Sequence, residues 1–92
     1  MTNAVLVSIT GRVQGVGYRA WAVRQAQRRG LRGWVRNRLD GSVEALIIGD
    51  EPEIADMIAA CRKGPSLAQV EDVLRRPAQD DGSAGFTDWP TE

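Results

Sequence analysis

The order in which two kinds of hydrophobic periodicity follow one another restricts the fold of this chain more than any other feature of its sequence. Alternation at every second residue is typical of strands with one buried face, whereas spacings of three and four residues are typical of amphipathic helices. Along the chain these patterns predict strand, helix, strand, strand, helix and strand, followed by a short last strand. The predicted elements are Ala4–Thr10, Tyr18–Arg29, Leu31–Arg38, Ser42–Ile48, a helix between Asp50 and Gly64, Ala68–Arg76 and Phe86–Trp89.

This order matches the split β-α-β arrangement of ferredoxin-like domains. We therefore expect an α+β fold, a βαββαβ sandwich with a mainly antiparallel sheet of four to five strands. Both helices should cover one sheet face, because each has a single apolar stripe to bury. The other face, with Trp34 and its neighbours, should be open to water. Without a linker or repeat, residues 1–92 are expected to form a single domain.

The length of the turn at Asp40-Gly41 decides which side chains of the central hairpin share a face. A two-residue turn pairs Asn37 with Glu44, and a three-residue turn pairs Asn37 with Val43. Only the longer turn groups the apolar side chains on one face, so we expect that register. A bulge is expected between residues 70 and 73, where the apolar positions break strict alternation.

Composition excludes several kinds of site. The chain has no histidine, which excludes a histidine general base and a Ser-His-Asp triad. Its one cysteine, Cys61, excludes an intrachain disulfide and a cysteine-cluster zinc site, and a lone thiol fits a reducing cytoplasm. No apolar run approaches the length of a membrane span, and the N-terminus has no signal-peptide pattern. We expect a cytoplasmic protein without a membrane partner or a bound metal.

The charges are distributed unevenly although the formal net charge is zero. Residues 1–43 carry eight arginines and one acid, Asp40, whereas residues 44–92 carry four basic and 11 acidic side chains. Such asymmetry indicates an anionic ligand on the first half of the chain. A chance distribution over an α/β surface is the alternative.

The loop between the first strand and the first helix is a candidate anion site. Gly15 and Gly17 permit positive φ angles that turn successive backbone N–H groups toward one point. The loop enters a helix N-terminus, where free N–H groups and the helix dipole favour an anion. Arg19 in the first turn can reach back over the loop, and its fork of donors suits phosphoryl oxygens. The alternative is an ordinary strand-to-helix turn with a solvated arginine, which can contain the same two glycines. The spacing of the glycines fits neither a Walker A motif nor a Rossmann loop.

Asn37 is a second candidate, because either register places it on the helix-covered side at the end of its strand. A buried amide without a partner costs about 1–3 kcal/mol, so its side chain needs a polar neighbour. That neighbour can be the backbone of the adjacent turn or a ligand.

At these positions the sequence resembles the acylphosphatase family. One block, Gly11-Arg12-Val13-Gln14-Gly15-Val16-Gly17-Tyr18-Arg19, is similar to the family's phosphate loop. A second block, residues 33–44, matches its Gly-Trp-Val-x-Asn-x-x-Asp-Gly pattern. Weaker likeness continues to Phe86 and covers most of the chain.

The resemblance implies roles for individual residues. Arg19 would bind the phosphate and Asn37 would orient the attacking water. The backbone amides would come from the loop residues Gln14, Gly15, Val16, Gly17 and Tyr18. The implied reaction is hydrolysis of the carboxyl–phosphate anhydride of an acyl phosphate to a carboxylate and inorganic phosphate, without metal or cofactor.

Two alternatives belong to other functional classes. A non-catalytic, anion-binding domain of the same family would keep the loop, but a 92-residue chain without a linker favours a free-standing enzyme. A nucleic-acid-binding module of this topology would stack bases on aromatic side chains of the central strands. Ala4–Thr10 and Ser42–Ile48 have none, so no nucleic acid is expected as a partner. We expect a monomer whose partners are a small acyl phosphate and the phosphate product.

Overall fold

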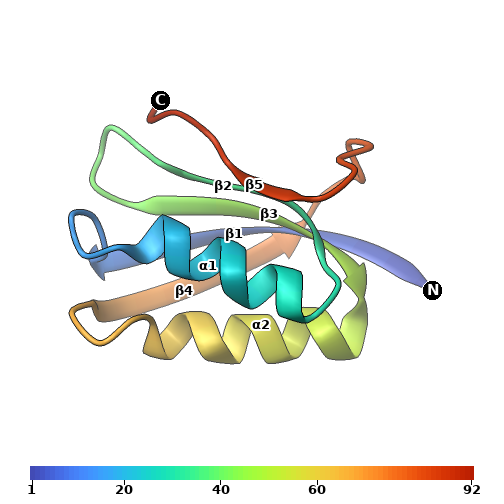
Figure 1. Cartoon of the computed structure of the whole chain (residues 1–92), viewed down its shortest axis with the longest axis horizontal. Helices are drawn as coiled ribbons and strands as arrows, with labels where there is room; N and C mark the ends of the chain where they lie inside the picture. Colours follow the sequence, from blue (N-terminus) through green and yellow to red (C-terminus); the bar gives the residue numbers. More distant parts are fainter.

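The computed structural model describes all residues from 1 to 92 and contains seven helices and strands. They are β1 (Thr2–Arg12), α1 (Tyr18–Arg28), β2 (Arg32–Asn37), β3 (Val43–Asp50), α2 (Glu51–Lys63), β4 (Gln69–Pro77) and β5 (Phe86–Asp88). The strands form one sheet in the order β4-β1-β3-β2-β5, in which β5 is parallel to β2 and every other pair is antiparallel. Both helices lie on the same face of this sheet (Figure 1). The predicted ferredoxin-like α+β fold is confirmed.

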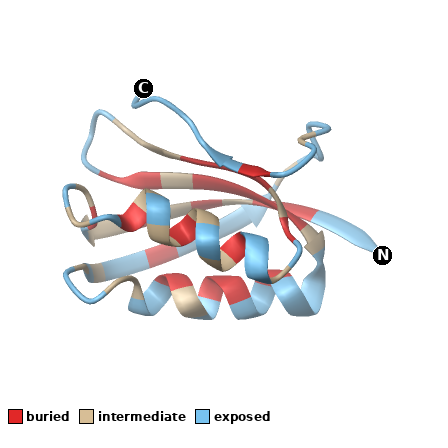
Figure 2. Cartoon of the chain, viewed as in Figure 1, coloured by how far each residue is buried: buried red, intermediate tan, exposed pale blue.

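The main core lies between the two helices and the sheet (Figure 2). Helix α2 buries the stripe expected from its spacing, which consists of Ile54, Met57, Ile58 and Cys61. Helix α1 buries Tyr18, Ala22 and Ala26, whose spacing of four residues places them on one side. The small alanines let α1 lie close to the sheet, which fixes the position of its N-terminus relative to β2.

The hairpin register agrees with the three-residue turn. Asn37 pairs with Val43, and the Arg38 N–H donates to the Ser42 carbonyl at 2.8 Å. The carboxylate of Asp40 accepts hydrogen bonds from the Ser42 backbone N–H at 2.9 Å and from its hydroxyl at 2.6 Å. The turn is therefore held by its own side chains, and Asn37 falls on the helix side of the sheet.

The bulge in β4 also lies where it was expected. Thr10 pairs with Asp72 and Gly11 pairs with Val70, so Glu71 is the extra residue on β4. The register shift bends the end of β1 just before the loop that joins it to α1. This loop, residues 13–17, contains Gly15 and Gly17 and is called the glycine loop below.

The prediction that the second sheet face is open to water is wrong for the half formed by β2 and β3. Trp34 is only 7% exposed and Ile48 is fully buried. The segment 78–85 covers them, and the Trp34 indole N–H donates to the Asp81 carboxylate at 3.1 Å. The ring of Trp89 stacks on Trp34 with centroids 4.3 Å apart. The polar loop after β4 thus covers an apolar surface, while most of its own residues stay exposed to solvent.

The other half of this face, over β1 and β4, remains hollow. A cavity of about 610 Å³ lies there, and Leu6, Ser8, Arg38 and Leu74 are among its lining residues. It contains no residue of the glycine loop. None of the helices is both long enough and apolar enough to span a bilayer.

Candidate active site

The loop between β1 and α1 has the backbone geometry that its glycines predicted. Gly15 and Gly17 have φ angles of 74° and 80°, in the left-handed region that side chains disfavour. A Cβ atom at either position would meet no atom within 4 Å, so these glycines are needed for their conformation and not for space. The N–H groups of Gly15, Val16 and Gly17 donate no hydrogen bond to the backbone. They are available to a ligand.

The N-terminus of α1 continues this row of free donors. The first helical hydrogen bond runs from the Trp21 N–H to the Gly17 carbonyl at 3.1 Å, so the N–H groups of the first turn have no helical partner. Gly17 occupies the N-cap and offers no capping side chain, and the first turn contains no acid. The positive end of the helix dipole is therefore uncompensated, which favours an anion at this point.

Arg19 stands in that first turn with most of its donors free. Its Nη1 donates to the Trp89 carbonyl at 3.3 Å. None of the seven ion pairs in the structure involves Arg19, so no carboxylate lies within 4.0 Å of its guanidinium. The carbonyl orients the side chain without neutralising its charge.

Arg19 and Asn37 share one cavity of about 220 Å³. Its wall consists of Val13, Gly15, Gly17, Tyr18, Arg19, Ala20, Asn37 and Asp88. The side chain of Asn37 makes no hydrogen bond to the adjacent turn, which is held instead by Asp40 and Ser42. Its amide is therefore free to bind water or a ligand in the cavity.

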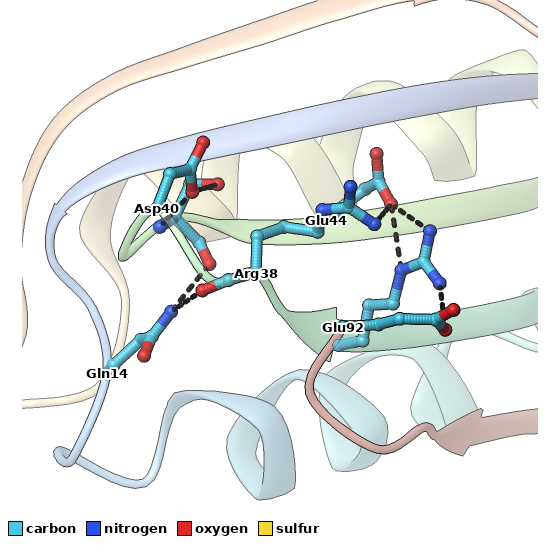
Figure 3. Close-up of polar contacts among 7 residues, drawn as sticks. Gln14, Arg38, Asp40, Glu44 and Glu92 are labelled. Atoms are coloured by element: carbon cyan, nitrogen blue, oxygen red, sulfur yellow. Dashed lines mark hydrogen bonds and ion pairs between the residues drawn. The ribbon is translucent and has the colours of Figure 1, made fainter.

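Gln14 points to the turn between β2 and β3 and does not line the cavity. Its Nε2 donates to the carbonyls of Arg38 and Ser42 at 2.8 and 2.9 Å, as Figure 3 shows. These bonds join the glycine loop to the hairpin that carries Asn37. Gln14 and Val16 do not line the cavity, and Val16 packs against the main core instead.

Tyr18 anchors the beginning of α1 to the end of α2. Its ring is buried, and its hydroxyl donates to the Cys61 carbonyl at 2.7 Å. Burial raises the pKa of Tyr18 far above its ordinary value, so the hydroxyl remains a donor. Burial likewise raises the pKa of the Cys61 thiol to about 11, which keeps it protonated and unreactive at neutral pH.

One family model matches nearly the whole chain. The sequence model described as acylphosphatase matches residues 5–87. The chain belongs to the acylphosphatase family.

Individual acylphosphatases agree with this assignment. An acylphosphatase from Rhodopseudomonas palustris is 60% identical over 75 residues, which cover 82% of this chain and 76% of that protein. One from Rhodospirillum rubrum is 48% identical over 89 residues and aligns with 97% of this chain and 98% of its own. The crystal structure of an acylphosphatase from Bacillus subtilis has a TM-score of 0.90 at 33% identity, covering 97% of this chain and 99% of that one.

Asp88 lines the cavity although the acylphosphatase motif blocks do not contain it. It reaches the cavity because β5 pairs in parallel with β2, which places residue 88 beside Val35. The one signal in the sequence is its spacing from Phe86, since residues two apart on a strand share a face and Phe86 is buried on the helix side.

Proposed function

We propose that this chain is an acylphosphatase that hydrolyses the carboxyl–phosphate anhydride of acyl phosphates to a carboxylate and inorganic phosphate. The observation that supports this most strongly is the shared cavity. It brings the unpaired amides of the glycine loop, the unneutralised guanidinium of Arg19 and the free amide of Asn37 to one place. Such a set can bind a phosphoryl group and a water molecule together.

Binding of the phosphoryl group falls to the loop and Arg19. The N–H groups of the loop and of the first turn of α1 donate to the phosphoryl oxygens, and the Arg19 fork adds two parallel donors. In phosphoryl transfer the charge is spread over these oxygens, so donors fixed in advance stabilise the transition state. Gln14 keeps the loop at a constant distance from Asn37.

Asn37 orients the attacking water. Its amide oxygen accepts a hydrogen bond from the water, whose oxygen attacks phosphorus in line with the bond to the acyl oxygen. The phosphorus–oxygen bond to the acyl group breaks, the carboxylate leaves with the electron pair, and a phosphoryl oxygen takes the proton of the water. The leaving group is a weak base, so the reaction needs no strong acid in the protein.

The remaining properties are part of the same proposal. We infer a metal-independent enzyme without a cofactor, since Arg19 and the amides supply the positive charge at the phosphoryl group. The chain is proposed to act as a single-domain, cytoplasmic monomer on small molecules, without a nucleic acid or a membrane as partner. The aromatic ring most suited to stacking a base, Trp34, is covered by Trp89 and Asp81, which supports a small-molecule substrate.

One assay tests the proposed function. The protein is incubated with benzoyl phosphate in buffers with and without a chelator, and release of benzoate is measured in each with and without inorganic phosphate. We expect hydrolysis that phosphate inhibits competitively, with p-nitrophenyl phosphate as a poor substrate. Absence of hydrolysis, or equal rates on both substrates, contradicts the proposal. Loss of activity in the chelator contradicts metal independence alone.

A further inference from the structure

A carboxylate lies in the wall of the cavity that we assign to the phosphoryl group. Asp88 lines this cavity together with Arg19 and Asn37. Its orientation follows from the alternation of β5, because Phe86 packs into the core on the helix side. Trp89, the next residue after Asp88, turns to the opposite face and stacks on Trp34. Asp88 therefore points to the same side of the sheet as Arg19.

No neighbour neutralises this carboxylate. Asp88 takes part in none of the ion pairs of the structure, and the side chain is exposed at the cavity. The pairing of β5 with β2 uses backbone groups only. The fold thus gives the Asp88 carboxylate no structural partner, although its place in an anion-binding cavity works against phosphate binding.

We propose that Asp88 selects substrates by the charge of their acyl group. This inference rests on the proposed function, because it assigns a second role at the same cavity. With the phosphoryl group held by the loop and Arg19, the acyl group occupies the part of the same cavity that Asp88 lines. A carboxylate on the acyl group is repelled there, whereas a neutral group is tolerated and an ammonium group is attracted. The preferred substrates are acyl phosphates with a neutral or cationic acyl group.

Coulomb's law sets the size of the effect. One unit charge acting across a cavity filled with water changes binding by a factor of about two to six. Acyl groups that differ by two unit charges should therefore differ about four-fold or more. Because the cavity is open to solvent, high salt should weaken this preference.

Three substrates whose acyl groups carry different charges test the inference. They are benzoyl phosphate and its para-carboxy and para-trimethylammonio derivatives. For each, kcat/KM is measured with the wild type, with Asp88→Asn and with Glu53→Gln. Asparagine keeps the shape of aspartate. Glu53 is the matched control, since it is an exposed acid without an ion pair at the start of α2, at the opposite end of the molecule from the glycine loop (Figure 1).

The informative quantity is the ratio of kcat/KM for the cationic substrate to that for the anionic substrate. Differences in intrinsic reactivity cancel when this ratio is compared between variants. We expect Asp88→Asn to lower the ratio about four-fold or more, and Glu53→Gln to leave it unchanged. Asp88→Asn should also lower the inhibition constant of inorganic phosphate, because one repulsive charge is removed.

Several outcomes overturn the inference. The ratio could be the same in Asp88→Asn as in the wild type, or fall equally in Glu53→Gln. An equal rise for all three substrates would mean that Asp88 only weakens the field of Arg19. Loss of hydrolysis of all three by a folded Asp88→Asn would make Asp88 a catalytic residue. A wild type that hydrolyses none of the three contradicts the proposed function itself, which separates the two failures.

Discussion

At the scale of single residues, Arg19 is the charged group on which the proposed chemistry depends. We predict that Arg19→Ala lowers kcat/KM for benzoyl phosphate about 10²- to 10³-fold, the loss of about 2.7–4 kcal/mol of transition-state stabilisation. Arg19→Lys should recover little, because an ammonium group is a point charge and cannot donate two parallel hydrogen bonds. Arg24→Ala, which removes an exposed arginine from the same helix, is the control. Near wild-type hydrolysis by Arg19→Lys would contradict the assignment.

Substitution of Asn37 should lower the catalytic rate without weakening the binding of phosphate. Its side chain makes no hydrogen bond within the hairpin, so Asn37→Ala should change the free energy of unfolding by no more than about 0.5 kcal/mol. Loss of the positioned water should lower kcat about 10²-fold, while the inhibition constant of inorganic phosphate stays nearly constant. Steady-state kinetics with phosphate as inhibitor measures both quantities. Parallel losses in kcat and in phosphate affinity would show that Asn37 shapes the cavity rather than orienting water.

The residues of the cavity differ in how far the sequence could predict them. Arg19 and Asn37 lie in two blocks of local pattern, and the fold brings these blocks together through β1, β2 and the core beneath them. Asp88 lies in a three-residue strand whose partner depends on the path of the chain after β4. No periodicity encodes that β5 pairs in parallel with β2, so a carboxylate near residue 88 could not be linked to the phosphate loop from sequence.

At the scale of elements, the glycine loop and the β2–β3 hairpin form one unit through Gln14. We predict that Gln14→Met, which keeps the side-chain length but cannot donate, lowers kcat/KM about ten-fold or more as the loop moves relative to Asn37. The carbonyls of Arg38 and Ser42 each lose one hydrogen bond but keep a backbone donor, and the loss of these two bonds should lower the free energy of unfolding by about 1–3 kcal/mol. Urea unfolding and hydrolysis of benzoyl phosphate measure the two effects.

The control for this prediction is Gln69→Met, which alters an exposed glutamine at the start of β4. It should change neither stability nor activity. If Gln14→Met behaves like Gln69→Met, the two hydrogen bonds of Gln14 have no role in holding the loop.

Most elements could be predicted because their side chains sort into apolar and polar faces. The hairpin register followed from the one turn length that keeps the apolar side chains together, and the bulge followed from a break in alternation. The cover over Trp34 could not be predicted in this way. Residues 80–83 are polar as in a solvated loop, yet Asp80 pairs with Arg32 and Asp81 binds the Trp34 indole. Polar side chains that bind the rim of an apolar surface leave no periodic signal.

At the scale of the whole molecule, folding pairs four of the eight arginines of the first half of the chain with acids of the second half. All but one of the ion pairs join the arginine-rich half to the acidic half, as between Arg29 and Asp56 or between Arg36 and Glu44. Four arginines of the first half form no ion pair, and of these only Arg19 lines the cavity beside the glycine loop; the other three are Arg12, Arg24 and Arg28. The uneven distribution of charge therefore suggests an anion site without locating it, because the position of the proposed site depends on which unpaired arginine the fold places beside the glycine loop.

The C-terminal segment, residues 89–92, contacts both the covered sheet face around Trp34 and Arg19 in the cavity. Trp89 stacks on Trp34, its N–H donates to the Val35 carbonyl at 2.8 Å, and its own carbonyl accepts from Arg19 at 3.3 Å. Removal of residues 89–92 should therefore lower stability and activity together. We predict a loss of about 1–3 kcal/mol in the free energy of unfolding, since a half-exposed aromatic stack contributes less than a core side chain. We also predict a several-fold rise in the inhibition constant of phosphate, because Arg19 loses the acceptor that orients it and because the new C-terminal carboxylate lies on Asp88, in the wall of the cavity.

A point variant distinguishes the two contributions of this segment. Trp89→Ala removes the stacked ring but keeps the carbonyl that faces Arg19, so it should lose stability while its phosphate affinity stays close to that of the wild type. Urea unfolding followed by circular dichroism and phosphate inhibition of benzoyl phosphate hydrolysis provide the two measurements. If Trp89→Ala weakens phosphate binding as much as the truncation does, the ring and not the carbonyl positions Arg19. If the truncation leaves both quantities unchanged, the contacts of the C-terminal segment with Arg19 and Trp34 contribute nothing to the site or to the fold.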